Sequence, residues 1–484
     1  MDKSFYQMVE RIGKEYAERS SFQWYSDVEK RLKTKTYAEY IQDAKLFAGY
    51  LMTIDPNIKG KHIAIAAQNS YHYAVLLLGT ICSGAVAVLV NPQEKEDILL
   101  NALRTADASV LFSDSEKIRA HIGGSLQIPA LKMNDYESQK ELAVFSEQRP
   151  DTLAVLLFTS GTSGAQKCVM LSHNNLIAAT NYSNYEFEKY VMKGVKNPIM
   201  GSLHMLPMYH VIGIVNIYCV LVHGDILNLC CDMRYLMRDN TLMQSDYTVV
   251  VPMILQMLYK GIVSGHPEVL GEWKSIITGG AKIDDTLADV FVEYGINLIQ
   301  SYGMSETSGF GVYHYANDTR KYSALGKPGL DTEAKFINGE LCLRGPLVML
   351  GYYKNPDATA EVLQDGWMHT GDMGYIGEDG YIYLNGRKKN LIILSNGENV
   401  SPEELEALLL KNGSIREVLV KEKNDRICAE IFCDMQERDA IEAYINQMNK
   451  SLPYYKQIVL TEYRTEPFER TATGKIRRLS LPLS

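Results

Sequence analysis

A run of small hydroxyl residues and glycines that ends in a lysine is the segment best suited to bind phosphate. The run spans Thr159 to Lys167 and follows the apolar strand pattern of Val155 to Phe158. Glycines let backbone amides crowd around phosphate oxygens, and a lysine adds a compact positive charge. A flexible polar loop is the alternative. A Walker loop is excluded, because Gln166 stands where that motif requires the glycine before its lysine.

This loop resembles the phosphate loop of the adenylate-forming superfamily, which contains acyl-CoA synthetases, nonribosomal-peptide adenylation domains and firefly-type luciferases. The usual form has proline and glycine on either side of the lysine, where this chain has Gln166 and Cys168. The resemblance implies that the loop binds ATP. The residues expected to do so are Thr159, Ser160, Gly161, Thr162, Ser163, Gly164 and Lys167.

Two further segments are similar, in the family's order, to those that hold the adenine. Gly279-Gly280-Ala281 follows an apolar strand pattern, and the missing side chains let a backbone approach a flat ring, although an ordinary tight turn is the alternative. Tyr302-Gly303-Met304-Ser305-Glu306 matches the motif Tyr-Gly-x-Ser/Thr-Glu. By resemblance, Tyr302 packs on the adenine, Ser305 approaches the α-phosphate, and Gly303 belongs to the same nucleotide-binding segment.

The same motif implies a magnesium site. Glu306, together with Thr162 of the phosphate loop, is expected to hold Mg²⁺, because a hard cation that bridges phosphate oxygens takes oxygen ligands. A buried tyrosine beside a surface-exposed Glu306 is the alternative.

His369-Thr370-Gly371-Asp372 and Gly386-Arg387 complete the nucleotide-binding motifs by resemblance. A carboxylate accepts hydrogen bonds from both ribose hydroxyls, so Asp372 is expected to bind the sugar, with Arg387 contributing from the domain junction. Either residue could instead form a structural ion pair.

The last motif, Arg470 to Ile476, contains the lysine that the resemblance makes catalytic. Without that context, Lys475 would be part of a solvated basic tail. In the family this lysine reaches the carboxylate and the α-phosphate across an interdomain cleft, where its charge stabilises the transition state of in-line attack. The substrate carboxylate, already ionised at neutral pH, attacks the α-phosphorus of ATP and gives acyl-adenylate and pyrophosphate.

A second half-reaction is implied by the same resemblance. The small C-terminal domain is expected to rotate about a hinge at Lys389 and to present the loop from Ser395 to Asn399. The thiol of coenzyme A then displaces AMP. Glu398 is expected to line the approach of the thiol, with a solvent-exposed hinge glutamate as the alternative.

The substrate class depends on Leu206 to Gly213, which looks like the family's Pro-x-aromatic-His-x-x-Gly segment beside the acyl pocket. His210 is expected to gate that pocket between the half-reactions, with a core histidine as the alternative. Relatives that activate amino acids carry an aspartate in this segment. Tyr209-His210 offers no such charge, which favours fatty or aryl acids, and the run from Gly386 to Glu406 most resembles bacterial long-chain acyl-CoA synthetases.

Three functions follow as candidates. The leading one is an acyl-CoA ligase that uses ATP, Mg²⁺ and coenzyme A on a small carboxylic acid. The second is a stand-alone adenylating enzyme that loads the thiol of a carrier protein, and the third is a nucleotide-binding regulatory protein without catalysis. The third is disfavoured because the charged residues of every motif are present, namely Lys167, Glu306, Asp372, Arg387 and Lys475.

Alternating helix and strand patterns must position these motifs. An apolar helical face at Asp97 to Ala106 is followed by a strand pattern at Ser109 to Phe112. Further strand patterns occur at His62 to Ala67, Leu153 to Phe158 and Thr248 to Val251. Repeated βα units predict largely parallel sheets covered by helices. The uncharged run from Ala74 to Val90 is predicted to be a buried helix, a glycine turn and a buried strand rather than a membrane span.

The pattern changes after about Ser323, where short antiparallel strands predict a β-rich subdomain. These strands are Glu340 to Arg344, Gly374 to Gly377 and Tyr381 to Leu384. Beyond Arg387 we expect a strand at Leu391 to Leu394, a turn at Asn396-Gly397, a helix capped by Ser401, strands at Val418 to Lys421 and Ile427 to Phe432, and a helix at Arg438 to Asn449. The expected fold is α/β, with a body of two βα-layered sheets and the β-rich subdomain (residues 1–387) and a small mobile α+β domain (residues 388–484).

Length and composition predict two or more domains and limit the possible partners. The 484 residues, 46% of them hydrophobic, exceed what one core usually supports. The formal net charge is −9 and no basic patch of useful length occurs, so nucleic acid is not an expected partner. The eight cysteines are scattered without zinc-binding spacing, and the N-terminus lacks a secretory signal. We therefore expect a cytoplasmic protein without a transmembrane segment.

Overall fold

The computed structural model describes residues 1–159, 166–190, 199–280, 283, 285–315, 324–395, 398–469, 476 and 478. Its contacts divide it into two compact units. The first consists of Met1–Ala334 and Leu343–Met368, and the second of Lys335–Cys342 and His369–Ser484. The second unit thus begins at Lys335, earlier in the chain than the boundary expected at residue 388. The hinge expected there, and the mobility of the C-terminal domain, stay predictions.

The first unit contains a sheet whose central strands are parallel and whose edge strands are antiparallel. In spatial order its strands are β15 (Lys327–Pro328), β14 (Val312–Tyr315), β13 (Asn297–Tyr302), β12 (Ser275–Gly279), β11 (Tyr247–Val250), β9 (Gly201–His204), β10 (Ile226–Leu229), β1 (Ser20–Ser26) and β2 (Arg31–Thr36). The strands from β13 to β1 are parallel to their neighbours. The parallel strands therefore end at one edge, where ligands bind in open α/β sheets.

A second sheet of the first unit carries the phosphate-loop motif. Its strands, in spatial order, are β18 (Gly351–Tyr352), β8 (Lys167–Ser172), β7 (Leu153–Thr159), β4 (Val86–Leu89), β3 (His62–Ile65), β5 (Ala108–Phe112) and β6 (Ala130–Leu131). The strands from β7 to β6 are parallel, whereas β8 runs antiparallel to β7 and to β18. The expected largely parallel sheets are confirmed.

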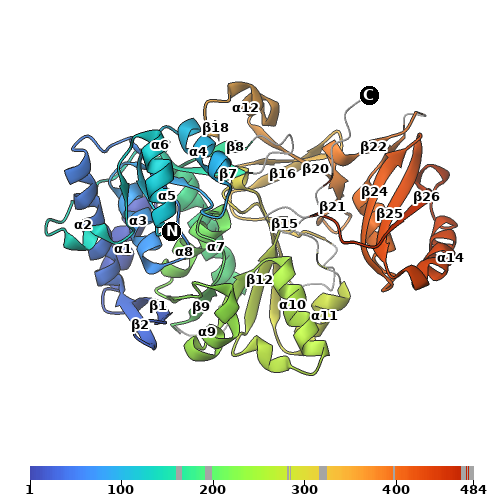
Figure 1. Cartoon of the computed structure of the whole chain (residues 1–484), viewed down its shortest axis with the longest axis horizontal. Helices are drawn as coiled ribbons and strands as arrows, with labels where there is room; N and C mark the ends of the chain where they lie inside the picture. The colour runs from blue at the N-terminus through green and yellow to red at the C-terminus, as the bar shows by residue number, and fades with distance from the viewer. Residues whose placement is uncertain are drawn as a thin grey trace. The chain divides into compact units, whose positions relative to one another are not determined.

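Helices cover both sheets of the first unit. They are α1 (Phe5–Glu15), α2 (Tyr37–Ile54), α3 (Tyr71–Cys82), α4 (Glu96–Thr105), α5 (Glu116–Ile118), α6 (Gly124–Leu126), α7 (His173–Tyr190), α8 (Val211–Leu221), α9 (Leu236–Met243), α10 (Pro252–Val263), α11 (Asp285–Glu293) and α12 (Pro356–Val362). Helices α10 and α11 lie side by side next to β12 (Figure 1). Together with β11, β12 and β13 they enclose a separate apolar cluster around Phe291 and Leu298. Burial of such side chains stabilises the fold by about 2 kcal/mol each.

The predicted interpretation of Ala74 to Val90 is confirmed. Helix α3 is buried along almost its whole length, Gly84 turns the chain at a φ of +81°, and the buried strand β4 follows. A positive φ of this size favours glycine, which has no Cβ to clash with the backbone. Across the described ranges, no helix combines the length and the apolar character that crossing a membrane requires.

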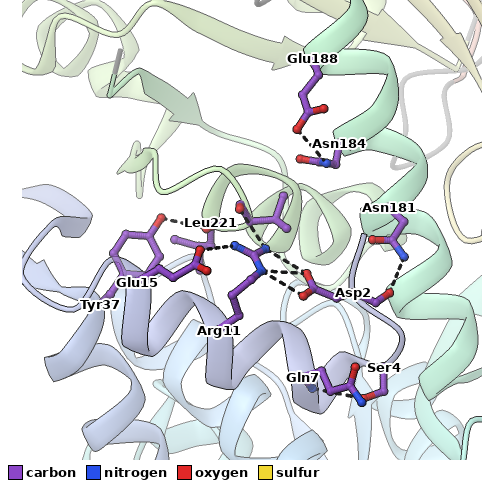
Figure 2. A network of polar contacts seen from close by, with 11 residues as sticks. Asp2, Ser4, Gln7, Arg11, Glu15, Tyr37, Asn181, Asn184, Glu188 and Leu221 are labelled. Carbon is purple, nitrogen blue, oxygen red and sulfur yellow. Dashed lines mark hydrogen bonds and ion pairs between the residues drawn. The ribbon is translucent and has the colours of Figure 1, made fainter. Parts of the chain in front are cut away.

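A polar network holds the N-terminal helix α1 in place (Figure 2). The guanidinium of Arg11 donates to both carboxylate oxygens of Asp2, at 2.9–3.3 Å, and to the carbonyl of Val222 at 3.3 Å. Asn181 of α7 donates to the Asp2 carbonyl at 2.9 Å. The apolar face of α1, which includes the buried Phe5, packs in the main core.

The second unit holds the β-rich segment and the C-terminal α+β fold. Its strands and helices are β20 (Trp367–Ile376, which begins in the first unit), β21 (Ile382–Arg387), β22 (Ile392–Ile393), β23 (Asn399–Val400), α13 (Pro402–Leu409), β24 (Ile415–Lys423), β25 (Arg426–Cys433), α14 (Arg438–Asn449) and β26 (Ile458–Arg464). The chain also passes between the units within β16 (Glu333–Ile337) and β17 (Glu340–Arg344), and β19 (Leu363–Gln364) belongs to the first unit. The expected α/β class is confirmed. Strand β26, which pairs parallel to β25, was not predicted from the sequence.

Candidate functional site

The phosphate-loop motif connects two paired strands. Thr159 and Lys167 are register partners at the ends of β7 and β8, and the Thr159 hydroxyl donates to the Lys167 carbonyl at 3.4 Å. The ammonium of Lys167 lies 4.7 Å from the ring centroid of Tyr352. The predicted loop residues Ser160, Gly161, Thr162, Ser163 and Gly164 lie outside the described residues.

The glycines of the expected adenine segment meet a real steric limit. A Cβ at Gly279, the last residue of β12, would lie 2.4 Å from the carbonyl oxygen of Ser301 in β13. Gly280 has a φ of +89°. Glycine is therefore required by strand packing at the first position and by backbone conformation at the second. Ala281 lies outside the described residues.

The Tyr-Gly-Met-Ser-Glu motif lies at the carboxyl end of β13. Tyr302 ends the strand, and a Cβ at Gly303 would lie 2.3 Å from the Gly309 carbonyl. Ser305 begins a short 3-10 helix (Ser305–Thr307) that carries Glu306. Glu306 is 7% exposed, and its Oε1 accepts a hydrogen bond of 2.8 Å from the Tyr352 hydroxyl. The alternative of a surface glutamate is therefore wrong.

His210 is the residue just before α8, and burial lowers its pKa. Its ring centroid lies 4.7 Å from that of Tyr209. A Cβ at Gly213 would lie 2.0 Å from the Pro207 carbonyl, so the glycine lets the helix start tightly against this segment. A lowered pKa keeps the imidazole neutral at neutral pH.

Asn69, which the sequence analysis did not single out, holds the same segment in place. Its side-chain amide donates to the Leu206 carbonyl at 2.8 Å, and its Oδ1 accepts from the Met208 amide at 2.9 Å. Asn69 is 7% exposed and lies between β3 and α3. The two bonds fix the backbone on both sides of Pro207, immediately before Tyr209 and His210.

In the second unit, Asp372 of β20 and Arg387 of β21 are register partners joined by an ion pair of 2.7 Å. Asp372 is 5% exposed, and its backbone amide donates to the Thr370 hydroxyl at 3.1 Å. The guanidinium of Arg387 also donates to the Thr370 carbonyl at 3.3 Å. The alternative reading of these residues, a structural ion pair, is present in the structure, and a role in binding ribose stays a prediction.

Glu340 is a further buried carboxylate of the second unit that the motifs did not reveal. It is 5% exposed and accepts hydrogen bonds from Lys388 (2.8 Å), the Gly371 amide (2.9 Å) and His369 (3.1 Å). Burial on its own would raise the pKa of Glu340, but these donors outweigh it and lower the pKa. Glu340 therefore fixes the backbone just before Asp372.

The hinge loop and the catalytic motif are described only in part. Glu398 is exposed, and its carbonyl accepts from the Leu394 amide at 3.0 Å. Lys475 and the predicted turn at Asn396-Gly397 lie outside the described residues. Arg478, which is close to Lys475 in the sequence, pairs with Glu406 and donates to the Val420 carbonyl at 3.2 Å. Burial raises the pKa of Glu406 to about 7, and the charge of Arg478 opposes this rise.

The family is established by comparison with known proteins. The AMP-binding enzyme family matches residues 9–353, which is more than half of the chain. The chain therefore belongs to the family of AMP-binding enzymes.

Individual relatives agree with this assignment. The 2-succinylbenzoate–CoA ligase of Oceanobacillus iheyensis is 29% identical over 406 residues, with 80% of each chain covered. The long-chain-fatty-acid–CoA ligase of Escherichia coli O157:H7 is 26% identical over 99% of this chain and 94% of its own. The o-succinylbenzoate coenzyme A synthetase of Bacillus subtilis, solved with its acyl-adenylate intermediate, shares the fold at a TM-score of 0.83 and 23% identity, with 97% of this chain and 96% of that chain covered. The expected enzyme class, an adenylate-forming acyl-CoA ligase, is confirmed.

Proposed function

We propose that this ligase activates a fatty or aryl carboxylic acid with ATP and transfers the acyl group to coenzyme A. The observation that carries the substrate class is the segment fixed by Asn69, which presents Tyr209 and a neutral His210 and no carboxylate. An α-amino acid brings an ammonium group, and burying that charge without an anionic partner is costly. The names of the relatives support both remaining classes, since they include a 2-succinylbenzoate–CoA ligase, a 4-coumarate–CoA ligase-like protein and a long-chain-fatty-acid–CoA ligase.

In the first half-reaction, the motif residues bind ATP and promote attack of the acid on it. Lys167 and the hairpin loop before it bind the phosphates, and Gly279, Gly280, Ala281 and Tyr302 bind the adenine. Asp372 binds the ribose with help from Arg387. Lys475 stabilises the charge that develops as the carboxylate attacks the α-phosphorus. This attack needs no general base, because the acid is already ionised at neutral pH.

Magnesium is assigned to Glu306 and Thr162. The donor set fits this ion, because a carboxylate supplies hard oxygen and Mg²⁺ usually takes one or two carboxylates together with substrate phosphates. Among the described residues no group of three or more His, Cys, Asp or Glu side chains is arranged as a metal cage. When bound with ATP, the ion would neutralise charge on the phosphate oxygens. The o-succinylbenzoate coenzyme A synthetase of Bacillus subtilis has been solved in complex with ATP and magnesium ion, which supports magnesium as the metal.

The second half-reaction uses a thiol. We assign it to coenzyme A, with Glu398 lining its approach after rotation about Lys389, and His210 opening or closing the acyl pocket between the half-reactions. The alternative acceptor is a carrier-protein thiol.

The location we propose is the cytoplasm. All eight cysteines of the chain are free, which supports a reducing compartment of this kind.

A panel of acids tests the proposal. Exchange of labelled pyrophosphate into ATP is measured with straight-chain fatty acids, cinnamic and benzoic acids, and α-amino acids. We expect exchange with one of the first two classes and none with amino acids. Exchange with amino acids alone, or with none of the acids, would overturn the proposed substrate class. Coenzyme A and candidate carrier proteins are then offered to the enzyme with the competent acid, and the acceptor is identified by mass.

A further inference from the structure

Residues 346–353, called here the connector, join the magnesium motif to the phosphate-loop hairpin. Asn175 of α7 donates to two carbonyls of the connector, at 2.8 and 2.9 Å. The Met349 amide donates to the Glu306 carbonyl at 2.9 Å, and the last connector amide donates to the Cys168 carbonyl at 2.7 Å. The connector is therefore fixed to the backbone beside Glu306 at one end and to β8, which begins with Lys167, at the other.

Tyr352 is the connector residue whose side chain touches both charged groups. Its hydroxyl donates to Oε1 of Glu306 at 2.8 Å, and the ammonium of Lys167 lies 4.7 Å from its ring centroid. Tyr352 is 4% exposed and Glu306 is 7% exposed. We propose that Tyr352 is a positioning residue, which orients the Glu306 carboxylate for the metal of a metal–ATP complex and holds the Lys167 ammonium for the phosphates.

Two physical effects support this role. A hydrogen bond to an ionised carboxylate is about twice as strong as a neutral one, and fixing one oxygen orients the other toward a ligand. Partners of this kind behind a metal ligand typically contribute about 10- to 100-fold to metal affinity. The ring face also attracts a cation within about 6 Å. A phenol is protonated at neutral pH, so the Tyr352 hydroxyl can donate to the carboxylate.

The neighbouring Tyr353 provides a matched control. Its hydroxyl donates to Asp107 at 2.8 Å, and the ammonium of Lys354 lies 5.5 Å from its ring centroid. The same trio of tyrosine, carboxylate and lysine thus occurs twice on consecutive residues, but Asp107 and Lys354 are about half exposed and belong to none of the motifs. Tyr353→Phe therefore removes the same kind of bond without touching the proposed site.

The inference rests on the proposed function, and its test separates the two. Mn²⁺ replaces Mg²⁺, and its binding to the full chain with α,β-methylene ATP, which is not cleaved at the α-phosphate, is followed by electron paramagnetic resonance. We expect Tyr352→Phe to weaken Mn²⁺ binding by about tenfold, and Tyr353→Phe to leave it unchanged. Thermal unfolding of both variants checks that they fold.

Glu306→Gln is measured in the same way. If Glu306→Gln weakens Mn²⁺ binding but Tyr352→Phe does not, the positioning role of Tyr352 is wrong and the metal site stands. If Glu306→Gln also leaves binding unchanged, the proposed metal ligand itself is wrong. Tyr352→Leu, which removes the ring as well, should in addition weaken binding of the metal-free analogue. Equal analogue affinity in the Phe and Leu variants would refute the contribution of the ring to Lys167.

Discussion

Asp372 and Arg387 face each other across β20 and β21, with 2.7 Å between Oδ1 and Nε. The side chain of Asp372 is 7% exposed and that of Arg387 is 39% exposed. A ribose that bound to Asp372 would therefore share a buried carboxylate with an arginine that is already in place. The charge on that carboxylate is expected to matter more than its shape.

Replacing Asp372 by asparagine keeps the shape and removes the charge. Hydrogen bonds to charged groups contribute about 1.5–3 kcal/mol, against about 1 kcal/mol for neutral ones. We expect Asp372→Asn to weaken ATP binding by about 2- to 30-fold, measured by calorimetry with α,β-methylene ATP. Glu333→Gln, which alters the exposed pair with Arg344, serves as control and should leave the affinity unchanged. Equal affinities for all three proteins would contradict the ribose role.

Lys475→Ala should separate the two half-reactions. Its charge is proposed to act only in the transition state of adenylate formation, so pyrophosphate exchange should fall by about 100-fold or more, while thiol transfer from preformed acyl-adenylate stays near the rate of the unaltered enzyme. Single-turnover assays measure each half. Lys450→Ala, at another lysine of the second unit, is the control. A comparable loss in both halves would refute the assignment.

Asp225 is expected to make the stability of the first unit depend on pH. It is 1% exposed, and burial raises its pKa from 3.8 to about 7. A carboxyl group whose pKa is raised on folding contributes its stability fully below the unfolded value near 4, and that contribution is lost as the pH rises through 7. The difference of about 3 pH units corresponds to roughly 4 kcal/mol as an upper bound.

Asp225→Asn should remove this dependence. The amide oxygen can still accept from the Met200 amide, which donates to Asp225 at 3.0 Å. We expect the melting temperature of the variant to exceed that of the unaltered protein at pH 8 and to match it at pH 4. Asp365→Asn, at an exposed turn residue, is the control. A gain of the same size at both pH values would show that the carboxylate charge is not the cause.

Asn69→Ala should affect both stability and the acid site. It leaves the Leu206 carbonyl and the Met208 amide without their side-chain partner, at a cost of about 1–3 kcal/mol. We expect the KM for the acid to rise about tenfold while the KM for ATP changes little, because the loosened segment carries Tyr209 and His210. Asn134→Ala, at an exposed asparagine, is the control. A rise in the KM for ATP alone would contradict this role.

The elements that follow from local periodicity were predictable. The helix expected at Arg438 to Asn449 has those bounds in the structure, and the helix after Ser401 begins where its cap and proline place it. Strand β26 was missed because its partly polar sequence gives no clear period, and its place depends on pairing with β25, some 30 residues earlier in the chain.

The site divides in the same way. Motif residues such as Glu306 could be named, because residue type and spacing carry the signal. Tyr352 could not, because it is one of 31 tyrosines and lies 46 residues from Glu306. Asn69 likewise contacts a carbonyl 137 residues away. Such positioning residues are specified by tertiary packing, which a single sequence does not reveal.

The two-residue strand β18 has a consequence for how this chain can vary in length. Because side chains alternate across a strand, one added residue between Met349 and Tyr352 would turn the side chain of Tyr352 outward and put the residue before it in its position. The backbone bonds on either side, from Met349 to Glu306 and from Tyr353 to Cys168, leave no slack to absorb the extra residue. Homologous chains of this architecture should therefore tolerate insertions before Pro346 or after Lys354, but keep the number of residues between Pro346 and Lys354 constant.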